Sequence, residues 1–322
     1  MKKVLVTGGA GFIGSHLCER LLKEEYFVIN LDNFNNYYDP KIKWRNIQEA
    51  LKSQNYALYA GDIRDNKILD QINEEQGKID IVCHLAAMAG VRNSLKDPVE
   101  YVSVDIGGTV NMLEFARRNG VEKFVFASSS SVYGKNSKVP FSEDDPLEGQ
   151  VSPYATAKRA GELYCQTYSE IYNIPIVALR FFTVYGPRQR PEMAIHLFTR
   201  LVMEGKPIPV FGDGSTARDY TYIDDIIEGV YRATLYDKTR FEIFNLGNSK
   251  TVKLSEMIAI IEQVTGKKAI IDRKPMQLGD VEITYANIAK GNSLLSYRPG
   301  SGIHQGVSEF FEWFEKNLGM EV

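Results

Sequence analysis

Val4-Leu5-Val6-Thr7-Gly8-Gly9-Ala10-Gly11-Phe12-Ile13-Gly14 joins a short apolar run to a cluster of glycines. The apolar residues predict a buried strand, and residues 12 to about 23 predict an amphipathic helix. Gly8, Gly11 and Gly14 recur at every third position, and the glycines also fit the spacing G-x-G-x-x-G. Such glycines permit a tight turn and let a pyrophosphate approach the backbone N–H groups at a helix start. The run therefore predicts a dinucleotide-binding unit.

A carboxylate follows the next predicted strand. The apolar run 27–31 ends at Asp32, 18 residues after Gly14, near the spacing at which dinucleotide-binding folds place an acid on the adenosine ribose. Asp32 would repel a 2′-phosphate, which favours NAD over NADP. The alternative is an ordinary turn of a flavodoxin-like fold, in which the aspartate is incidental.

Strands and helices alternate along the chain. We expect strands at 56–59, 79–87, 124–127, 176–179 and 241–246, and helices at 40–52, 97–119, 154–172, 223–235, 254–265 and 303–317. The predicted fold class is α/β, a Rossmann-type doubly wound parallel sheet with a smaller α/β substrate-binding cap domain. The NAD-binding Rossmann domain is expected over 1–180, with a return at about 223–246, and the cap over 181–222 and 247–322.

The predicted chemistry centres on Ser152-Pro153-Tyr154-Ala155-Thr156-Ala157-Lys158. Proline suits the first turn of a helix, where Tyr154 and Lys158 would lie one turn apart on the same face. A neighbouring ammonium favours the phenolate, so Tyr154 would act as a base. The alternative is an ordinary helix start, because this spacing often occurs by chance.

A run of four serines, 128–131, follows the apolar run 124–127. It would lie at the carboxyl edge of the sheet, where open α/β sheets bind ligands. Asp62 and Ile63 also follow a predicted strand and would face an adenine. A serine run alone is more often a loop, but its place before Tyr154 favours an active site.

Composition limits the partners and the compartment. The formal net charge is −3 and the pI is about 5.9, so no bulk field attracts nucleic acid or acidic lipid, and neither a nucleic acid nor a membrane is expected as a partner. The widely spaced Cys18, Cys83 and Cys165 suit reduced thiols in the cytoplasm. The four histidines lack the spacing of a metal site, so no metal is expected.

Together these motifs resemble the extended short-chain dehydrogenase/reductase family over nearly the whole chain. The resemblance rests on residues 7–14, 32, 62–63, 84–87, 128–134, 154–158 and 218–219. Within the family the chain is most similar to the nucleotide-sugar 4-epimerases. The branch that acts on UDP-glucuronate is the most similar of these, through residues 32–39, 89–92, 180–191 and 275–281.

The resemblance implies a tightly bound NAD and assigns roles to residues. The implied catalytic residues are Ser129, Tyr154 and Lys158, of which Lys158 also binds the nicotinamide ribose. The expected cofactor-binding residues are Gly8, Gly11, Phe12, Ile13, Gly14, Asp32, Asn33, Asp62, Ile63, Leu85, Ala86, Ala87, Ser128, Tyr154 and Lys158. The expected substrate-binding residues are Ser129, Ser130, Ser131, Tyr154, Thr183, Arg190, Arg218, Gln277 and Asp280.

Five of these substrate-binding residues lie in the second half of the chain, and the resemblance gives three of them a specific reading. By the resemblance, Arg218 contacts the diphosphate and Asp280 the uridine ribose. Gln277 stands where epimerases of UDP-galactose often have an arginine, which fits the glucuronate branch.

The expected reaction is NAD-dependent epimerisation at C4 of UDP-glucuronate to UDP-galacturonate, through a transient 4-keto sugar. The serine run lacks the Asp-Glu pair of the similar 4,6-dehydratases and the glutamate of the related uronate decarboxylases. An epimerase must also hold the carboxylate of a 4-keto uronate away from the alignment that expels carbon dioxide, and hydroxyls or Arg190 could hold it.

Three alternatives stay open. They are a 4-epimerase of a neutral UDP-hexose or UDP-N-acetylhexosamine, a UDP-glucuronate decarboxylase, and an NAD-binding regulatory or scaffold protein. The apolar stripe of helix 154–172 belongs either to the core or to an interface, and we expect a homodimer through this helix and helix 97–119.

Overall fold

A seven-stranded sheet forms the centre of the computed structural model, which describes residues 1–276 and 281–317. The strand order is β10-β6-β5-β4-β1-β2-β3, and every neighbouring pair is parallel. The strands are β1 (Lys3–Thr7), β2 (Phe27–Asp32), β3 (Tyr56–Ala60), β4 (Ile81–His84), β5 (Lys123–Ser129), β6 (Ile176–Phe181) and β10 (Phe241–Leu246). The predicted Rossmann-type fold class is confirmed.

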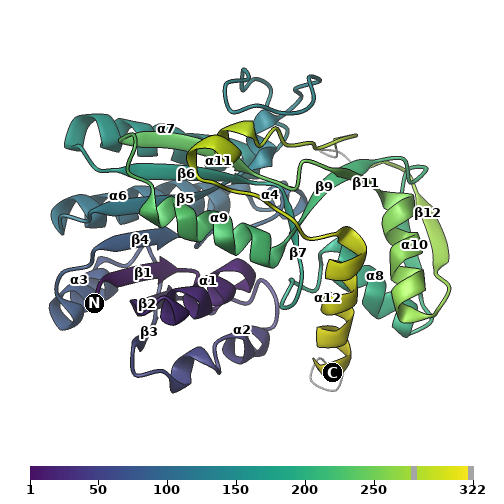
Figure 1. Ribbon diagram of the computed structural model, residues 1–322, viewed down its shortest axis with the longest axis horizontal. Helices are drawn as coiled ribbons and strands as arrows, with labels where there is room; N and C mark the ends of the chain where they lie inside the picture. Colours follow the sequence, from purple (N-terminus) through teal and green to yellow (C-terminus); the bar gives the residue numbers. More distant parts are fainter. Residues whose placement is uncertain (277–280, 318–322) are drawn as a thin grey trace.

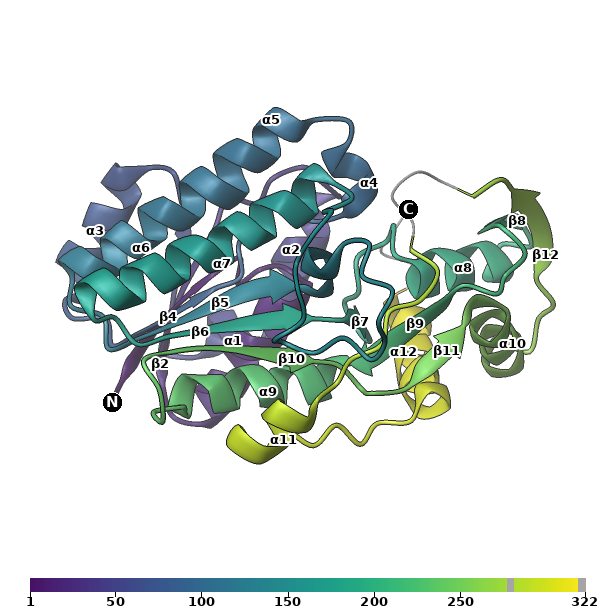
Figure 2. The same ribbon diagram turned by 90° about the horizontal axis from the view of Figure 1, so that it is seen from above.

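Helices cover both faces of this sheet (Figure 2). One face carries α1 (Phe12–Lys23) and α9 (Ile223–Leu235). The other carries α3 (Asn66–Gln76), α6 (Thr109–Arg118) and α7 (Pro153–Tyr172). Each face has its own apolar core, as expected for a parallel sheet buried on both sides. The strands thus end at one common edge, with their backbones held rigidly from both sides.

The order of the strands reverses beside β1. From β1 the chain runs outward to β2 and β3, and it then returns to place β4 on the opposite side of β1. Ligands of open α/β sheets bind at such a reversal, at the carboxyl ends of the strands. The glycine turn after β1 lies at this point.

A second lobe lies beyond the carboxyl ends of the strands (Figure 1). It contains the sheet β11-β9-β7 (Thr251–Lys253, Ala217–Tyr222, Thr183–Tyr185) and the parallel pair β8 (Pro207–Phe211) and β12 (Ile270–Lys274). Its helices are α8 (Ala194–Met203), α10 (Leu254–Thr265) and α12 (Ile303–Asn317), and α11 (Ala289–Leu294) lies near β10. The chain returns from this lobe to the large sheet through α9 and β10.

Two predicted helices differ in detail. The helix expected at 40–52 ends early: α2 covers Pro40–Asn46 and a separate turn, η1, covers Ala50–Lys52. Ile47 leaves helical geometry there, with φ −105° and ψ 1°. The helix expected at 97–119 is α5 (Pro98–Tyr101), a π-helical segment η2 (Val102–Gly108) and α6. The wider turn of a π-helix is frequent near functional sites.

Candidate active site

One cavity of about 480 Å³ opens at the carboxyl edge of the large sheet and extends towards the second lobe. Every predicted cofactor-binding and catalytic residue lines it, as do all predicted substrate-binding residues of the described chain. Gln277 and Asp280 lie outside the described residues. The structure therefore brings together predicted residues that are up to 210 positions apart in sequence, from Gly8 to Arg218.

The glycine turn forms one wall of the cavity. Gly8 has φ +71°, and a Cβ atom there would lie 2.9 Å from the backbone of Ala86. A Cβ atom at Gly14 would lie 2.1 Å from the carbonyl oxygen of Gly8. These contacts leave no room for side chains, so the turn packs closely and exposes backbone N–H groups at the start of α1. This is the cradle that a dinucleotide diphosphate requires.

Asp32 lines the cavity beside the glycine turn, at the end of β2. Its Oδ2 accepts a hydrogen bond from the Ala10 backbone N–H at 3.1 Å, and its Oδ1 accepts one from Phe34 at 2.9 Å. The Lys43 ammonium lies 3.7 Å from Oδ1, and both side chains are buried. Burial lowers the pKa of Lys43, whereas Asp32 acts in the opposite direction. Asp32 is thus held in a fixed position at the mouth of the glycine turn.

Asp62 lies at the outer end of this region. Hydrogen bonds from Arg64 lower the pKa of Asp62 to about 2, and Asn33 donates a further hydrogen bond to its Oδ2 at 3.1 Å. The carboxylate is therefore ionised at neutral pH. It remains only partly buried and can accept a hydrogen bond from a ligand.

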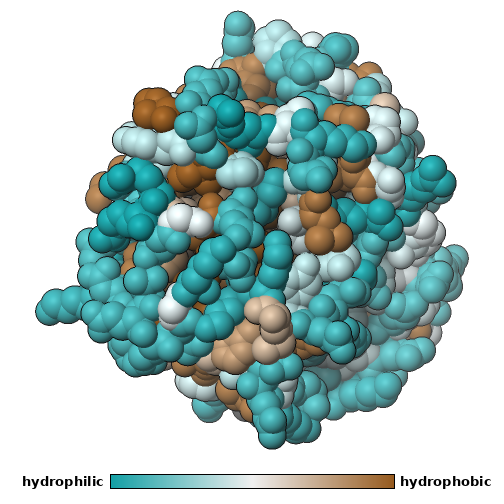
Figure 3. Space-filling model, turned by 60° about the vertical axis from the view of Figure 1, so that its left-hand side comes forward, coloured by the Kyte–Doolittle hydropathy of each residue, from teal (hydrophilic) through white to brown (hydrophobic). Residues whose placement is uncertain are grey.

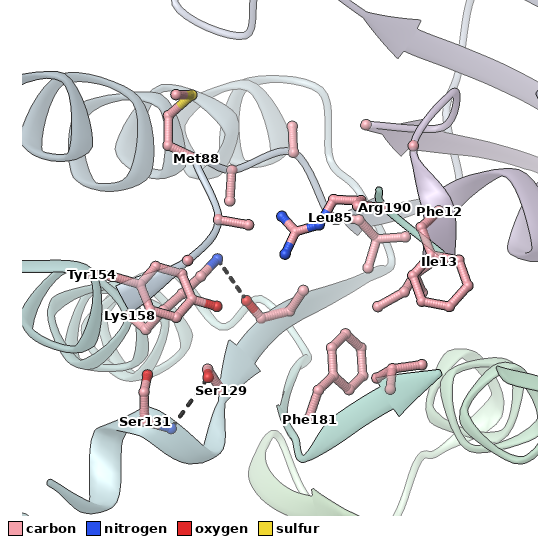
Figure 4. A pocket seen from close by; sticks show the side chains of 18 of the residues that line it. Phe12, Ile13, Leu85, Met88, Ser129, Ser131, Tyr154, Lys158, Phe181 and Arg190 are labelled. Carbon is pink, nitrogen blue, oxygen red and sulfur yellow. Dashed lines mark hydrogen bonds between the residues drawn. The ribbon is translucent and has the colours of Figure 1, made fainter. Parts of the chain in front are cut away.

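Tyr154 and Lys158 lie side by side on α7, as their spacing predicts (Figure 4). Ser152 caps the helix by accepting a hydrogen bond from the Ala155 N–H, and Pro153 occupies the first turn. The Lys158 Nζ lies 5.8 Å from the centre of the Tyr154 ring. It donates a hydrogen bond of 3.0 Å to the Ala127 carbonyl oxygen of β5. This bond fixes the ammonium beside the phenol.

The serine run connects β5 to the short helical turn η3 (Ser130–Tyr133). The Ser129 hydroxyl caps this turn by accepting a hydrogen bond of 3.2 Å from the Ser131 N–H (Figure 4). The Ser131 Oγ is buried, lines the cavity and has no hydrogen-bond partner within the described chain. An orphan hydroxyl in a cavity costs free energy unless a ligand or water completes it. The run therefore offers the cavity a polar wall.

Arg190 extends its guanidinium into the cavity (Figure 4). The guanidinium carbon lies 5.6 Å from the centre of the Tyr37 ring, and Nε lies 3.2 Å from a carboxylate oxygen of Glu192. Thr183 and Arg218 also line the cavity, from strands β7 and β9 of the second lobe. These two residues show that the lobe contributes directly to the pocket.

The carboxylates of the cavity are confined to one end. Among its described lining residues, Asp32 and Asp62 are the only acids, and both belong to the ends of β2 and β3. The described lining around Tyr154 and the serine run has hydroxyl groups but no carboxyl group. This part of the pocket can therefore orient a substrate and exchange one proton through Tyr154. Its described lining has no carboxyl group that could serve as a second acid or base.

Sequence reasoning missed several residues of the site. Tyr37, Tyr38, Lys43 and Met88 line the cavity, and none was assigned a role. The buried Asp105 supports Met88: its Oδ1 accepts a hydrogen bond from the Met88 N–H at 2.6 Å. The sequence contains a sign that Asp105 is unusual, because it is a charged residue within the apolar helical pattern 99–113.

No cluster of three or more His, Cys, Asp or Glu side chains within residues 1–276 and 281–317 has the geometry to hold a metal ion. The same part of the chain has no helix long and apolar enough to span a bilayer. Cys18, Cys83 and Cys165 are buried, unpaired thiols.

Known proteins are similar to this chain in both sequence and fold. Residues 4–247 match the NAD dependent epimerase/dehydratase family. The UDP-glucuronate 4-epimerase of Thermodesulfobacterium geofontis is 42% identical over 98% of this chain and 96% of its own length.

Two solved structures, each with a bound nucleotide sugar, have similar folds. The structure of UDP-glucuronic acid 4-epimerase from Bacillus cereus, in complex with UDP-glucuronic acid and NAD, has a TM-score of 0.91 and 39% identity, covering 98% of this chain and 99% of that one. The structure of UDP-glucose 4-epimerase from Thermotoga maritima, with UDP-glucose, has a TM-score of 0.90 and 31% identity over the same shares.

The buried Asp105 gives a prediction about stability. Burial raises the pKa of Asp105 to about 6, above the usual aspartate value near 3.8, although the nearby Lys158 opposes this rise. Charging Asp105 therefore costs the folded state free energy as the pH rises from about 4 through 6. Asp105→Asn keeps an acceptor for Met88 without the charge. The variant should be more stable than wild type by about 1–3 kcal/mol at pH 8 and equally stable at pH 4.

Urea unfolding at pH 4, 6 and 8 measures this difference. Asp62→Asn serves as a control of opposite sign, because the pKa of Asp62 is lowered and its charged form is favoured in the folded state. It should lose stability at pH 8. A difference for Asp105→Asn that does not change with pH would contradict the prediction.

Proposed function

The chain belongs to the NAD dependent epimerase/dehydratase family, and on that premise we propose that it interconverts UDP-glucuronate and UDP-galacturonate by inverting C4 of the sugar. One observation carries the choice of reaction. The described pocket around Tyr154 contains a base, an ammonium and hydroxyls, but no carboxylate. Elimination of water needs a further acid–base pair there, whereas epimerisation needs a single group that takes a proton and returns it.

NAD fits the site through residues that are already in place. The turn 8–14 would hold its diphosphate, Asp32 its adenosine ribose, and Asp62 with Ile63 its adenine. Lys158 uses one of its three donors on Ala127, so its others would reach the nicotinamide ribose. When bound, NAD accepts the hydride of C4 and returns it to the opposite face, with a 4-keto sugar as the transient product.

Tyr154 exchanges the proton of this reaction. Its phenol oxygen takes the proton from the C4 hydroxyl as the ketone forms, and it gives the proton back to the C4 oxygen afterwards. The Lys158 ammonium, 5.8 Å from the ring centre, stabilises the negative charge that develops on the phenol oxygen. Ser129 positions the C4 oxygen between itself and Tyr154. The sugar must turn over between the two steps, so its contacts with the pocket have to break and re-form between the two orientations.

The preference for a uronate rests on the hydroxyl wall. Ser129, Ser130, Ser131 and Thr183 would hold the carboxylate, and the unpartnered Ser131 hydroxyl is an open donor for it. Arg190 adds positive charge to the same cavity. The Arg190 guanidinium already contacts the Tyr37 ring and the Glu192 carboxylate. In this proposal the hydroxyls therefore contribute more than Arg190 to the preference for a uronate over a neutral sugar. The substrate names of the relatives at 42% and 39% identity support the uronate.

The two-domain organisation is part of the proposal. Residues 1–180, with a return at about 223–246, form the NAD-binding domain, and 181–222 with 247–322 form the substrate-binding cap. Arg218 would contact the diphosphate of the substrate. The assignments of Gln277 and Asp280 fall outside the described residues. We place the enzyme in the cytoplasm because its three thiols are buried and unpaired, which cell fractionation can check.

The reaction is tested with purified protein. Separate incubations with UDP-glucuronate, UDP-glucose and UDP-N-acetylglucosamine should give UDP-galacturonate from the first and little conversion of the others, as resolved by NMR. Turnover of a neutral sugar alone would overturn the choice of substrate. Formation of a UDP-pentose would identify a decarboxylase, and bound NAD with no turnover of any sugar would favour a regulatory or scaffold protein.

Tyr154→Phe tests the base. The change removes one hydroxyl group and should lower kcat by about 10³-fold or more, because general-base catalysis contributes about 10²–10⁴-fold. The content of bound NAD should stay at the wild-type level, as measured by absorbance after denaturation. Tyr164→Phe on the same helix is the matched control and should change kcat less than twofold. Wild-type activity of Tyr154→Phe would rule out this mechanism.

We also propose a homodimer through the helices near 97–119 and 154–172. Their exposed apolar side chains include Val99, Val102, Leu163, Tyr164, Ile171 and Tyr172. Figure 2 shows α5, α6 and α7 together on one side of the molecule, and Figure 3 shows hydrophobic side chains exposed among hydrophilic ones. Two such surfaces would bury each other in a symmetric contact.

Sedimentation should therefore show a dimer for the wild type. Val102→Asp combined with Leu163→Asp should give a monomer, because each charge would be buried without a partner. Leu51→Asp, at an exposed apolar residue outside these helices, should remain dimeric. A monomeric wild type, or a dimeric double variant, would place the interface elsewhere or remove it.

A further inference from the structure

A buried ion pair lies directly behind the catalytic groups. Glu162 follows Lys158 by one helical turn on α7, and its side chain has no exposed area. Its Oε1 accepts a hydrogen bond from Arg180 Nε at 2.8 Å, and its Oε2 accepts one from the second Arg180 nitrogen at 3.0 Å. Arg180 is 1% exposed. Two parallel bonds between planar groups fix both position and orientation.

The same carboxylate holds the strand that carries the serines. The Ser128 hydroxyl donates a hydrogen bond of 2.6 Å to Glu162 Oε1. One turn earlier, Lys158 donates to the carbonyl oxygen of Ala127. Helix α7 is therefore bonded to two consecutive residues of β5. Ser129 is the next residue along that strand, so its distance from Tyr154 depends on these two bonds.

Arg180 extends the connection to the far side of the serine run. It lies opposite Ser128 in the register of β5 and β6. Its remaining terminal nitrogen donates hydrogen bonds of 3.0 Å to the Tyr133 hydroxyl and 3.1 Å to the Glu143 carbonyl oxygen. Tyr133 ends the helical turn that Ser129 caps. The ends of this turn are thus held through Glu162 and Arg180.

The connection ends on the returning strand β10. The Tyr133 hydroxyl donates a hydrogen bond of 2.7 Å to the Asn245 side chain. The Asn245 amide in turn donates to the carbonyl oxygens of Phe141 and Asn287, at 2.9 and 3.1 Å. The Tyr133 and Asn245 side chains are buried, and these bonds satisfy polar groups that would otherwise be costly to bury.

We propose that Glu162 and Arg180 are positioning residues for the C4 chemistry, which hold Ser129 at its working distance from Tyr154 through Ser128 and Tyr133. Neither residue lines the cavity, so neither touches the substrate. Their effect falls on the rate of the chemical step and not on binding, because a misplacement of about 1 Å can cost about a hundredfold in rate. The inference rests on the proposed function for the identity of the reacting groups.

Ser128→Ala is the first test, because it removes one hydrogen bond without leaving a buried charge unpaired. The expected result is a fall in kcat of about tenfold or more, with KM for UDP-glucuronate within twofold of wild type. NAD is kept saturating in the assay, because Ser128 itself lines the cavity. The kinetic isotope effect with substrate deuterated at C4 should increase, because C–H cleavage then limits turnover. A purely structural role would not change the isotope effect.

Ser169→Ala is the matched control. Ser169 is also buried on α7, and its hydroxyl donates to the Arg240 carbonyl oxygen at 3.2 Å, away from the cavity. Its kcat and isotope effect should equal those of the wild type. The proposal is overturned if Ser128→Ala keeps a wild-type kcat, or if only its KM changes.

The double variant Glu162→Leu with Arg180→Met tests the ion pair itself. Replacing both charges by apolar side chains avoids an unpaired buried charge. The other partner of Glu162, Arg159 at 3.0 Å, is 32% exposed, so water can solvate it in the variant. The folded protein should keep NAD and KM but lose at least tenfold in kcat, and a wild-type kcat would contradict the proposal. Ser128→Ala decides the question if the double variant does not fold.

These outcomes are separable from those of the proposed function. The function is judged on the wild type alone, by which sugar it converts. The positioning role is judged on the ratio of variant to wild-type kcat, measured with whichever sugar the wild type converts.

Discussion

The close contact between α7 and β5 is the constraint on which the site depends. Gly161 makes it possible: a Cβ atom at this position would lie 2.4 Å from the Phe126 ring of β5. Because no side chain separates the helix from the strand, the Lys158 ammonium reaches the Ala127 carbonyl oxygen, and the cation remains buried beside the phenol. A larger residue would move the helix outward and separate Tyr154 from the serine run.

Local patterns in the sequence predicted the parts of the site whose partners lie close along the chain. The glycine turn, Asp32, the serine run and the Tyr154–Lys158 spacing each follow from one short segment, and all of them line one cavity. Lys43, Asp105 and Glu162 were missed because their partners are fixed only by folding. Asp105 contacts Met88, and Glu162 contacts Ser128 and Arg180. No periodicity connects such pairs, although a charge within an apolar run marks Asp105 and Arg180 as unusual.

The second lobe was predictable in outline only. Its helices α10 and α12 follow from apolar periodicity, whereas its strands are short and lie among aromatic and proline residues. The strand β7 has three residues and β11 has three, too few for alternation to distinguish them from loops. The helix expected at 40–52 ends early. The apolar periodicity continues past Ile47, but the backbone leaves helical geometry at that residue.

The return of the chain through α9 and β10 has a consequence for recombination. Because β10 joins the outer edge of the large sheet between two passages through the second lobe, the strands of that lobe come from two separate stretches of sequence. A single crossover between β9 and β11 in related genes would exchange β11 without exchanging β9 and β7, and it would leave a mismatched small sheet. New substrate preference in this architecture is therefore more accessible by point substitution within the pocket than by exchange of segments.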